Sequence, residues 1–294
     1  MKPARFKYFD PFSIEEALAL VSEWGDEGKL LAGGQTLMPM LNFRALTPGA
    51  IIDINSISVL SGHEYTESGL VVGALTRQQT LEDDAILRFR QPLVAETIPF
   101  IAHRAVRNRG TVGGSLAHAD PAAEWGALAI TLNAELTLKK HRASDRIVAA
   151  RDFFLGLLET ALAPNEILAQ IRLPPWPRGA GWSVVEFSRR HGDFAIAGVM
   201  SVAMRDPEGA CTDARISVFG VGPAPFRLNY AEAELRGQIP TPSRVEAVVK
   251  AALSDVSPLE DNHSSAQYRR HLAAVLAERC FTEAFARASL ETDA

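Results

Sequence analysis

Two short segments of small residues have the composition of a phosphate-binding loop. Ala32–Thr36 is Ala-Gly-Gly-Gln-Thr, and Thr111–Ser115 is Thr-Val-Gly-Gly-Ser. Glycine leaves room for another molecule beside the main chain, and successive backbone N–H groups form a concave anion site. A single Gly-Gly pair is more often an ordinary turn. Two pairs, each followed closely by a hydroxyl residue, favour a dinucleotide cofactor.

Other chemistry has little support in the sequence. The two cysteines, Cys211 and Cys280, are far apart and are interpreted as reduced structural thiols. An iron–sulfur cluster needs more thiolates than this chain supplies by itself. The histidines are scattered and no His-Glu-x-x-His or Cys-x-x-Cys occurs, so we expect no metal site. Neither glycine pair continues as Gly-Lys-Ser/Thr and no Gly-x-Gly-x-x-Gly is present, which disfavours P-loop and Rossmann sites.

Composition is typical of a globular protein with two domains. The chain has 294 residues, of which 47% are hydrophobic and 22% are charged. Its net charge is −5 and acids and bases are interspersed, so nucleic acid is not an expected partner. No apolar run is long enough for a membrane span, and Met1–Phe6 lacks the apolar core of a signal peptide. We expect a cytoplasmic protein.

The elements that must position the two segments alternate between helix and strand. A capping box at Ser13, followed by apolar residues at helical spacing, predicts an amphipathic helix. A buried helix over 92–101 is expected to lead into a basic loop, 103–109, just before the second Gly-Gly pair. Apolar runs bounded by Pro, Gly or Ser predict strands over 30–32, 50–54 and 69–75.

Asp120 is predicted to begin a further helix. Asp is a good N-cap, and Pro121 suits the first helical position ahead of the apolar stretch 125–132. Capping alone explains Asp120, and contact with a ligand is the alternative.

The proline-rich segment 174–179 predicts a domain boundary. Strands are expected on both sides of it, and those after it suggest an antiparallel meander covered by two long helices. The predicted strands are 134–139, 166–173, 182–188, 194–205 and 214–221, and the predicted helices are 243–255 and 265–288.

Three segments, 30–37, 107–124 and 188–195, together resemble the FAD-binding medium subunit of the molybdenum hydroxylases. This family includes carbon monoxide dehydrogenase and bacterial xanthine dehydrogenase-like enzymes. The likeness covers nearly the whole chain. It implies an α+β fold in which a two-lobed FAD-binding domain of the vanillyl-alcohol-oxidase (PCMH) type, residues 1–176, precedes a smaller C-terminal domain, residues 177–294, of antiparallel sheet plus helices.

The same resemblance implies where FAD binds. The diphosphate and ribityl chain would lie against both Gly-Gly segments, with Ile101 packed near the cofactor. The implied cofactor-binding residues are Ala32, Gly33, Gly34, Gln35, Thr36, Leu37, Ile101, Thr111, Gly113, Gly114, Ser115, Ala119, Asp120, Glu124, Leu168, Glu186, Asp193 and Phe194.

Several of these positions depart from the family pattern. Thr36 stands where Ser is common and keeps the hydroxyl. Glu124 replaces Asp and is longer by a methylene group, whereas Glu186 stands where Lys is often found. Asp193 and Phe194 match a loop that approaches the isoalloxazine ring in this family. Phe194 either shields the ring or is a core residue at the start of a strand.

The resemblance implies a redox relay with no catalytic side chain. A large molybdenum-cofactor subunit would hydroxylate the substrate, a [2Fe-2S] small subunit would carry the electrons, and FAD on this chain would pass them to NAD, a quinone or oxygen. A dimer of heterotrimers is the usual assembly. The alternatives are a stand-alone FAD-dependent oxidoreductase of the same fold, such as the reductase of UDP-linked enolpyruvyl sugars, and a cofactor-free binding module.

Overall fold

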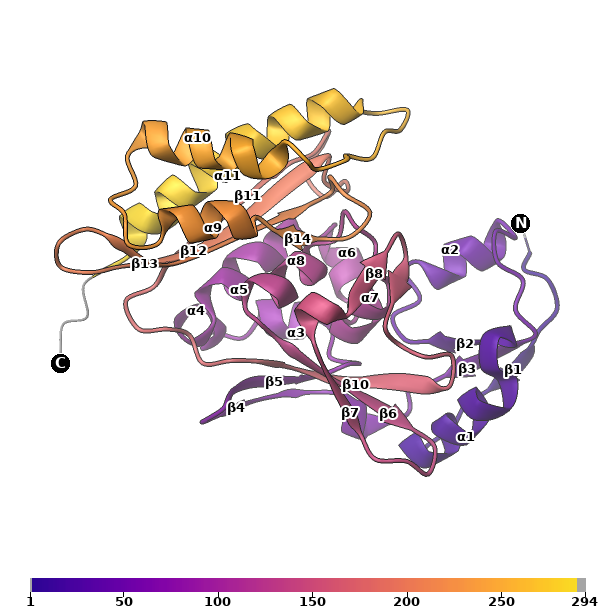
Figure 1. Cartoon of the computed structure of the whole chain (residues 1–294). Coiled ribbons are helices and arrows are strands. Elements are labelled where there is room, and N and C mark those ends of the chain that lie inside the picture. The colour runs from indigo at the N-terminus through magenta and orange to yellow at the C-terminus, as the bar shows by residue number, and fades with distance from the viewer. Residues whose placement is uncertain (1, 290–294) are drawn as a thin grey trace.

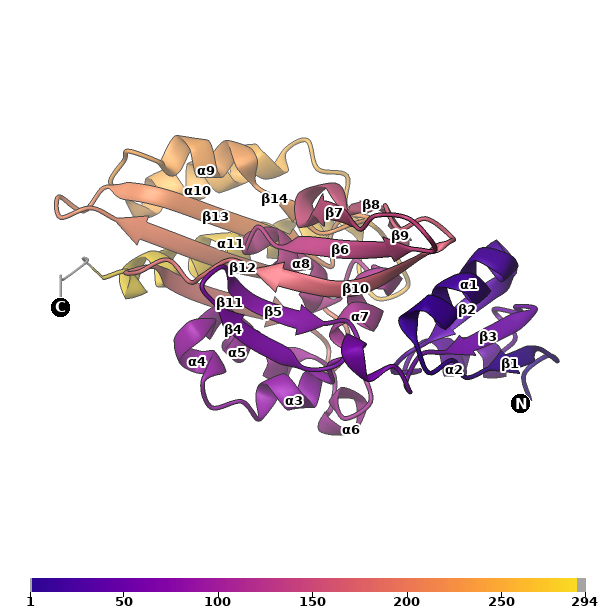
Figure 2. The ribbon, with the colours of Figure 1, turned by 90° about the horizontal axis from the view of Figure 1, so that it is seen from below.

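The computed structural model describes residues 2–289. Met1 and residues 290–294, the outer ends of the two predicted domains, lie outside the described residues. The chain forms sheets of three, five and four strands and a two-stranded hairpin, with helices packed against the sheets (Figure 1, Figure 2). This mixture confirms the α+β class. Among residues 2–289, no helix combines the length and apolar composition needed to cross a bilayer.

The N-terminal lobe is a parallel sheet of order β1-β3-β2 with helix α1 packed against it. Helix α1 (Ile14–Trp24) begins as the capping box predicts, because the Ser13 side chain accepts the backbone N–H of Glu16. Strand β2 delivers the chain to the first Gly-Gly pair, and α2 follows that pair. The other elements of this lobe are β1 (Lys7–Phe9), β2 (Gly28–Leu31), α2 (Leu37–Asn42) and β3 (Ala50–Asp53).

The second lobe is an antiparallel sheet of order β4-β5-β10-β6-β7, and its helices cover one face. The strands are β4 (His63–Thr66), β5 (Gly69–Gly73), β6 (Glu135–Lys140), β7 (Arg146–Ala149) and β10 (Glu166–Leu173), with the hairpin β8 (Phe154–Gly156) and β9 (Glu159–Thr160). The helices are α3 (Gln78–Glu82), α4 (Leu87–Arg90), α5 (Pro92–Thr97), α6 (Arg104–Arg107), α7 (Val112–His118) and α8 (Glu124–Thr131).

The C-terminal part is an antiparallel sheet of order β11-β12-β13-β14 with three helices on its outer face, at the top of Figure 1. The expected meander and its two long helices are confirmed, and the short helix α9 is an addition that the sequence patterns did not indicate. The elements are β11 (Gly181–Phe187), β12 (Ala197–Arg205), β13 (Cys211–Phe219), β14 (Phe226–Arg227), α9 (Asn229–Leu235), α10 (Pro242–Leu253) and α11 (Ala266–Arg287).

Strand β12 is buried on both faces. Met200 and Val202 belong to the core shared with α5 and α8 of the second lobe, whereas Val199 and Ala203 belong to the core beneath α9, α10 and α11. Side chains alternate between the faces of a strand, so one sheet closes two hydrophobic cores. The sheet therefore holds the C-terminal part firmly against the second lobe.

Two sequence predictions in the second lobe need correction. The helix expected over 92–101 ends at Thr97 and continues as a short 3-10 turn to Phe100, because Pro99 has no N–H to donate to the preceding turn. The basic loop expected over 103–109 contains the helical turn α6 (Arg104–Arg107). Single turns of this kind are too short to leave a periodic apolar pattern.

Arg269 of α11 ties the C-terminal helix to the edge of the sheet. Its side chain is buried, and Nη1 donates to the carbonyl oxygens of Ile196 (2.7 Å) and Gly220 (2.5 Å). The backbone N–H of Gly220 in turn donates to the carbonyl of Pro121 at 2.7 Å. A continuous set of hydrogen bonds thus links α11 to the segment that precedes α8.

We expect Arg269→Met to lower the free energy of unfolding by about 2–4 kcal/mol, because two buried carbonyl groups lose their donor. Urea unfolding measures the change. Arg270→Met is the matched control, since Arg270 is exposed and donates only to the carbonyl of Val256. Equal losses in the two variants would contradict this role of Arg269.

Candidate functional site

The first Gly-Gly segment has unused hydrogen-bond donors. It follows β2 directly, and Gly34 adopts a left-handed backbone with φ of +70°. The side chain of Gln35 donates to the carbonyl of Gly33 at 3.1 Å, which tightens the turn. Within residues 2–289, the backbone N–H groups of Gly33, Gly34, Gln35 and Thr36 have no hydrogen-bond acceptor. This segment can therefore receive an anion on its main chain.

The second Gly-Gly segment differs from the expectation that it also presents bare N–H groups. It forms the first turn of α7, where Thr111 is the N-cap and its Oγ1 accepts the Gly114 N–H at 3.1 Å. The Gly113 N–H donates to the carbonyl of Ala74 at 2.8 Å, and that of Ser115 donates to the carbonyl of Thr111. The N–H groups from Val112 to Ser115 are thus engaged within the protein, and among residues 2–289 only that of Thr111 in this segment has no acceptor.

Close packing of the main chain, and not anion binding alone, explains why Gly33 and Gly113 are glycines. A Cβ on Gly113 would lie 2.4 Å from the Cβ of Ala74, and a Cβ on Gly33 would lie 2.5 Å from the carbonyl oxygen of Arg109. The same atom on Gly33 would be 2.9 Å from Cα of Gly110. The main chain of the first glycine segment thus touches Arg109 and Gly110, immediately before the second segment, and only glycine fits at Gly33.

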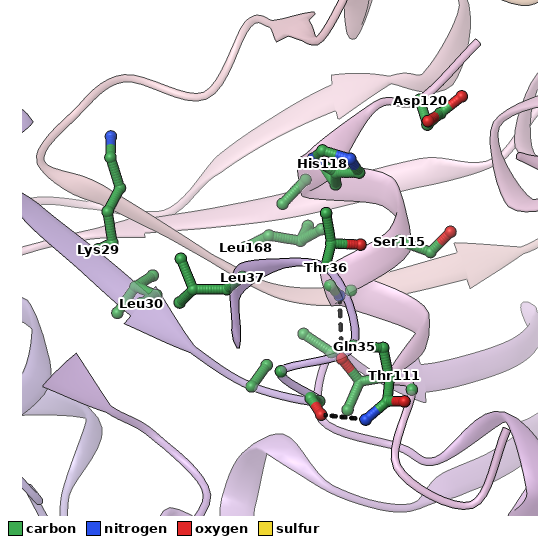
Figure 3. A pocket seen from close by; sticks show the side chains of 18 of the residues that line it. Lys29, Leu30, Gln35, Thr36, Leu37, Thr111, Ser115, His118, Asp120 and Leu168 are labelled. Atoms are coloured by element: carbon green, nitrogen blue, oxygen red, sulfur yellow. Dashed lines mark hydrogen bonds between the residues drawn. The ribbon is translucent and has the colours of Figure 1, made fainter. Parts of the chain in front are cut away.

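A cavity of about 670 Å³ opens between the lobes at this contact (Figure 3). Its volume is within the range of roughly 300–1,000 Å³ typical of small-molecule sites. The structure brings nearly all the predicted cofactor-binding residues to its walls, with Ala119 and Glu186 as the exceptions. Those lining it are Ala32, Gly33, Gly34, Gln35, Thr36, Leu37, Ile101, Thr111, Gly113, Gly114, Ser115, Asp120, Glu124, Leu168, Asp193 and Phe194.

The cavity wall also includes residues that were not predicted to bind the cofactor, among them Lys29, Leu30 and His118 (Figure 3). Lys29 lies on β2, which leads into the first glycine segment. His118 is three positions after Ser115 on α7, and this spacing places both on one face of the helix. Helical spacing is thus the signal that identifies His118. The hairpin β8–β9 also contributes Leu158 and Thr160, which no sequence pattern indicated.

Asp120 does not cap α8. The helix begins at Glu124 with Ala123 as N-cap, whereas the carboxylate of Asp120 accepts the N–H of Ala122 at 2.9 Å in a turn. The prediction that Asp120 and Pro121 start the helix is therefore wrong by three residues. Ala119, with φ of +53°, ends α7 in a left-handed conformation and is buried away from the cavity.

The basic segment before α7 contributes structure as well as charge. Arg107 is buried, and its guanidinium donates to both carboxylate oxygens of Glu82, at 2.7 and 3.0 Å. Arg107 therefore fixes α6 to α3 as an ion pair. Its neighbour His103 packs against Gly192, so this segment also supports the loop that carries Phe194.

Phe194 is not a core residue. Its side chain is 64% exposed and lines the cavity, and β12 begins only at Ala197. The interpretation of Phe194 as a buried residue at the start of a strand is therefore wrong. An exposed aromatic side chain at the mouth of a cavity can cover the face of a planar ligand.

Two carboxyl groups lie near one another at this site, that of Glu124, which is buried and lines the cavity, and that of Glu186, which is partly buried. Burial, with a smaller contribution from the charge of Asp120, raises the pKa of Glu124 to about 7. Burial, and then the charge of Glu124, raises the pKa of Glu186 to about 8. Oε2 of Glu186 is buried without a hydrogen-bond partner. The pair therefore holds a proton near neutral pH, when an isolated carboxyl group has lost it.

These pKa shifts make stability depend on pH. The folded state keeps protons that the unfolded chain releases above its ordinary carboxyl pKa of 4.5. The free energy of unfolding is therefore insensitive to this pair below about pH 4.5 and falls as the pH rises towards 8, by up to about 1.4 kcal/mol per unit and group.

We expect Glu186→Gln to remove part of this dependence, because the amide is neutral at every pH. The stability of the variant relative to wild type should increase by roughly 2–4 kcal/mol between about pH 5 and about pH 8, measured by urea unfolding. Glu234→Gln makes the same charge change at an exposed position. A constant difference between Glu186→Gln and wild type across this range would disprove the raised pKa of Glu186.

Comparison with known proteins identifies the family. Residues 4–176 match the FAD binding domain in molybdopterin dehydrogenase, and residues 182–284 match the CO dehydrogenase flavoprotein C-terminal domain. The carbon monoxide dehydrogenase medium chain of Hydrogenophaga pseudoflava is 38% identical, with 98% of this chain and 99% of that protein covered. The 6-hydroxypseudooxynicotine dehydrogenase complex subunit alpha of Paenarthrobacter nicotinovorans is 36% identical, with 98% and 97% covered.

Solved structures agree in fold. A chain of carbon monoxide dehydrogenase from Hydrogenophaga pseudoflava, in the form that lacks the Mo-pyranopterin moiety, superposes with a TM-score of 0.94 at 39% identity, covering 98% of this chain and 100% of that one. A chain of quinoline 2-oxidoreductase from Pseudomonas putida 86 superposes with a TM-score of 0.91 at 31% identity, covering 97% and 99%. The protein thus belongs to the FAD-binding medium subunits of the molybdenum hydroxylases, as an FAD-dependent oxidoreductase subunit.

Proposed function

We propose that this chain is the electron-output subunit of a molybdenum hydroxylase complex. Its FAD takes electrons from the iron–sulfur clusters of a partner and passes them to an external acceptor such as NAD, a quinone or oxygen. The cavity carries this proposal, because the free amides of the first glycine segment and nearly all the expected cofactor positions meet there.

The donor set fits FAD. The N–H groups from Gly33 to Thr36 suit the anionic diphosphate, and apolar walls such as Ile101 and Leu168 suit the flavin ring. The second glycine segment contributes mainly to the shape of the wall, because the N–H groups from Val112 to Ser115 are engaged and Gly113 packs closely against Ala74. We propose that the predicted residues on the cavity wall hold the cofactor, and that Glu186 supports Glu124 from behind.

The protein's own residues bind and orient the cofactor. Bound FAD would supply the electron transfer, which is chemistry of its isoalloxazine ring. Phe194, at the mouth of the cavity, covers the site and limits the access of water and acceptors. Glu124 keeps a proton at its carboxyl group in this buried environment. No side-chain nucleophile is needed for this role.

The partners follow from the same proposal. We infer a large subunit with the molybdenum cofactor and a small subunit with [2Fe-2S] clusters, arranged as a dimer of heterotrimers. Support comes from the relatives, which are named as the medium chain of a dehydrogenase or as a subunit of a dehydrogenase complex. The two cysteines are free and buried, and burial raises the pKa of each thiol to about 12. Cluster ligands must then come from another chain.

A division into two domains, 1–176 and 177–294, is also proposed. The first family match ends at residue 176, within the proline-rich segment 174–179, and the second begins at residue 182, just after it. The cytoplasmic location stays a prediction. A stand-alone reductase would need a proton donor such as Cys or Ser beside the flavin. Neither cysteine lines the cavity but Ser115 does, so co-purification with partner subunits decides between the two functions.

A tagged copy of this chain, expressed in its native host, should co-purify with a molybdenum subunit and a [2Fe-2S] subunit. Anaerobic substrate should bleach the flavin absorbance of the isolated complex, and the physiological acceptor should restore it. The isolated chain with substrate is the control and should not bleach. Purification of the chain alone with a substrate-reducible flavin would favour the stand-alone oxidoreductase.

We expect Gly33→Ala to weaken FAD binding by about tenfold or more, because its Cβ would push the first glycine segment away from Arg109. Titration of the flavin-free chain with FAD, followed by fluorescence, gives the dissociation constant. Gly209→Ala is the control, since Gly209, which unlike Gly33 has a left-handed backbone, has open space around it. Wild-type affinity in Gly33→Ala would contradict the assignment of this segment.

A further inference from the structure

A chain of side-chain hydrogen bonds runs behind the two glycine segments. Nδ2 of Asn55 donates to the carbonyl oxygens of Leu31 (3.3 Å) and Ala32 (2.9 Å), immediately before the first Gly-Gly pair. Nη2 of Arg77 donates to Oδ1 of Asn55 at 2.6 Å. Nη1 of Arg77 donates to the carbonyl oxygen of Arg109 at 2.5 Å, just before the second segment. Two side chains thus connect the starts of both segments.

The main chain of Arg77 is itself attached to the second segment. Arg77 forms an antiparallel bridge with Thr111. On either side of it, the N–H of Gln78 donates to the carbonyl of Gly110 at 3.0 Å, and the N–H of Val112 donates to the carbonyl of Thr76 at 3.1 Å. Arg77 is therefore fixed to the second lobe, and only its guanidinium reaches towards the first.

The carbonyl oxygen of Arg109 contacts both the Arg77 guanidinium and the first glycine segment. It accepts a hydrogen bond from Arg77, and it is also the atom that a Cβ on Gly33 would strike. A small movement of this carbonyl would change the contact between the two glycine segments. The side chains of Asn55 and Arg77 thus set the separation of the segments, although neither lines the cavity.

The charge of Arg77 indicates, independently of these hydrogen bonds, that an anion binds nearby. Its guanidinium is partly buried, and burial together with the charge of Arg109 lowers its pKa from the ordinary value. Its hydrogen bonds go to neutral oxygens. The charge of Asp53, whose carboxylate accepts a hydrogen bond from Asn55, acts in the opposite direction on this pKa, but within residues 2–289 Asp53 forms no ion pair with Arg77. A partly buried cation without a carboxylate partner favours an anion nearby.

We propose that Asn55 and Arg77 form a brace that positions the first glycine segment for the diphosphate of FAD. The inference rests on the proposed role of the cavity. Asn55 holds the end of β2, Arg77 holds Asn55 to the second lobe, and the guanidinium adds positive potential behind the unpaired amides. Both are positioning residues, because they act through the main chain of other residues.

Arg77→Gln tests the brace when FAD affinity and the stability of the flavin-free chain are measured together. We expect about tenfold weaker binding of FAD with only a modest loss of stability. Arg172→Gln is the matched control. Arg172 also links a carbonyl, that of Ser68, to a side-chain oxygen, that of Glu135, but it lies away from the cavity. It should lose stability and keep FAD affinity within about twofold.

Arg77→Lys separates charge from geometry, since lysine keeps the charge but lacks the planar fork that joins two acceptors. The brace requires weakened FAD binding in this variant too, and wild-type affinity would overturn it. Asn55→Ala should weaken binding to a similar extent, and the double variant with Arg77→Gln should lose little more than the worse single variant. Additive losses would show two independent effects and contradict a single brace.

Comparison of Arg77→Gln and Gly33→Ala with wild type separates a failure of the brace from a failure of the proposed FAD site. If wild type binds FAD and Arg77→Gln binds it equally well, the brace is wrong and the cavity assignment stands. If wild type binds FAD but Gly33→Ala does not weaken it, the assignment of the first segment is wrong, and the brace fails with it.

Discussion

The close approach of two main chains is the constraint on which the site depends. At Gly33, the end of a parallel sheet meets the segment Arg109–Gly110 of an antiparallel lobe without room for a Cβ. The two lobes can meet this closely only where side chains are absent. The cavity, its free amides and the position of α7 all follow from this contact. The hydrogen bonds of Asn55 and Arg77 maintain it from behind.

Much of this site could be predicted from sequence, because the requirement for glycine is local. Ala32–Thr36 and Thr111–Ser115 carry their signal in a few adjacent residues, and both reach the cavity wall. The state of their N–H groups could not be predicted. The donors of the second segment are engaged partly by Ala74, a residue distant in sequence. Only the three-dimensional structure shows that, among residues 2–289, the N–H groups from Gly33 to Thr36 are free whereas those from Val112 to Ser115 are engaged.

The wrong predictions for Asp120 and Phe194 also arise because local sequence patterns do not include tertiary contacts. Asp120 followed by Pro121 satisfies every local rule for a helix start, yet the chain makes a turn first and α8 begins at Glu124. Phe194 precedes an apolar run and is exposed, because the strand itself begins later. The major elements, including α1 and the C-terminal meander, were predictable from their periodicity. Short helical turns such as α6 depend on tertiary contacts and were not.

Strand β12 separates two hydrophobic cores and presents neither face to solvent. A sheet of this kind cannot be released from the rest of the molecule without wetting Met200 and Val202. We therefore expect the two segments that match the family models to unfold together, with amide exchange of β12 reporting the global free energy of unfolding. Recombination of the C-terminal unit with a foreign flavin unit then demands a matched apolar face, which restricts how such subunits exchange parts during evolution.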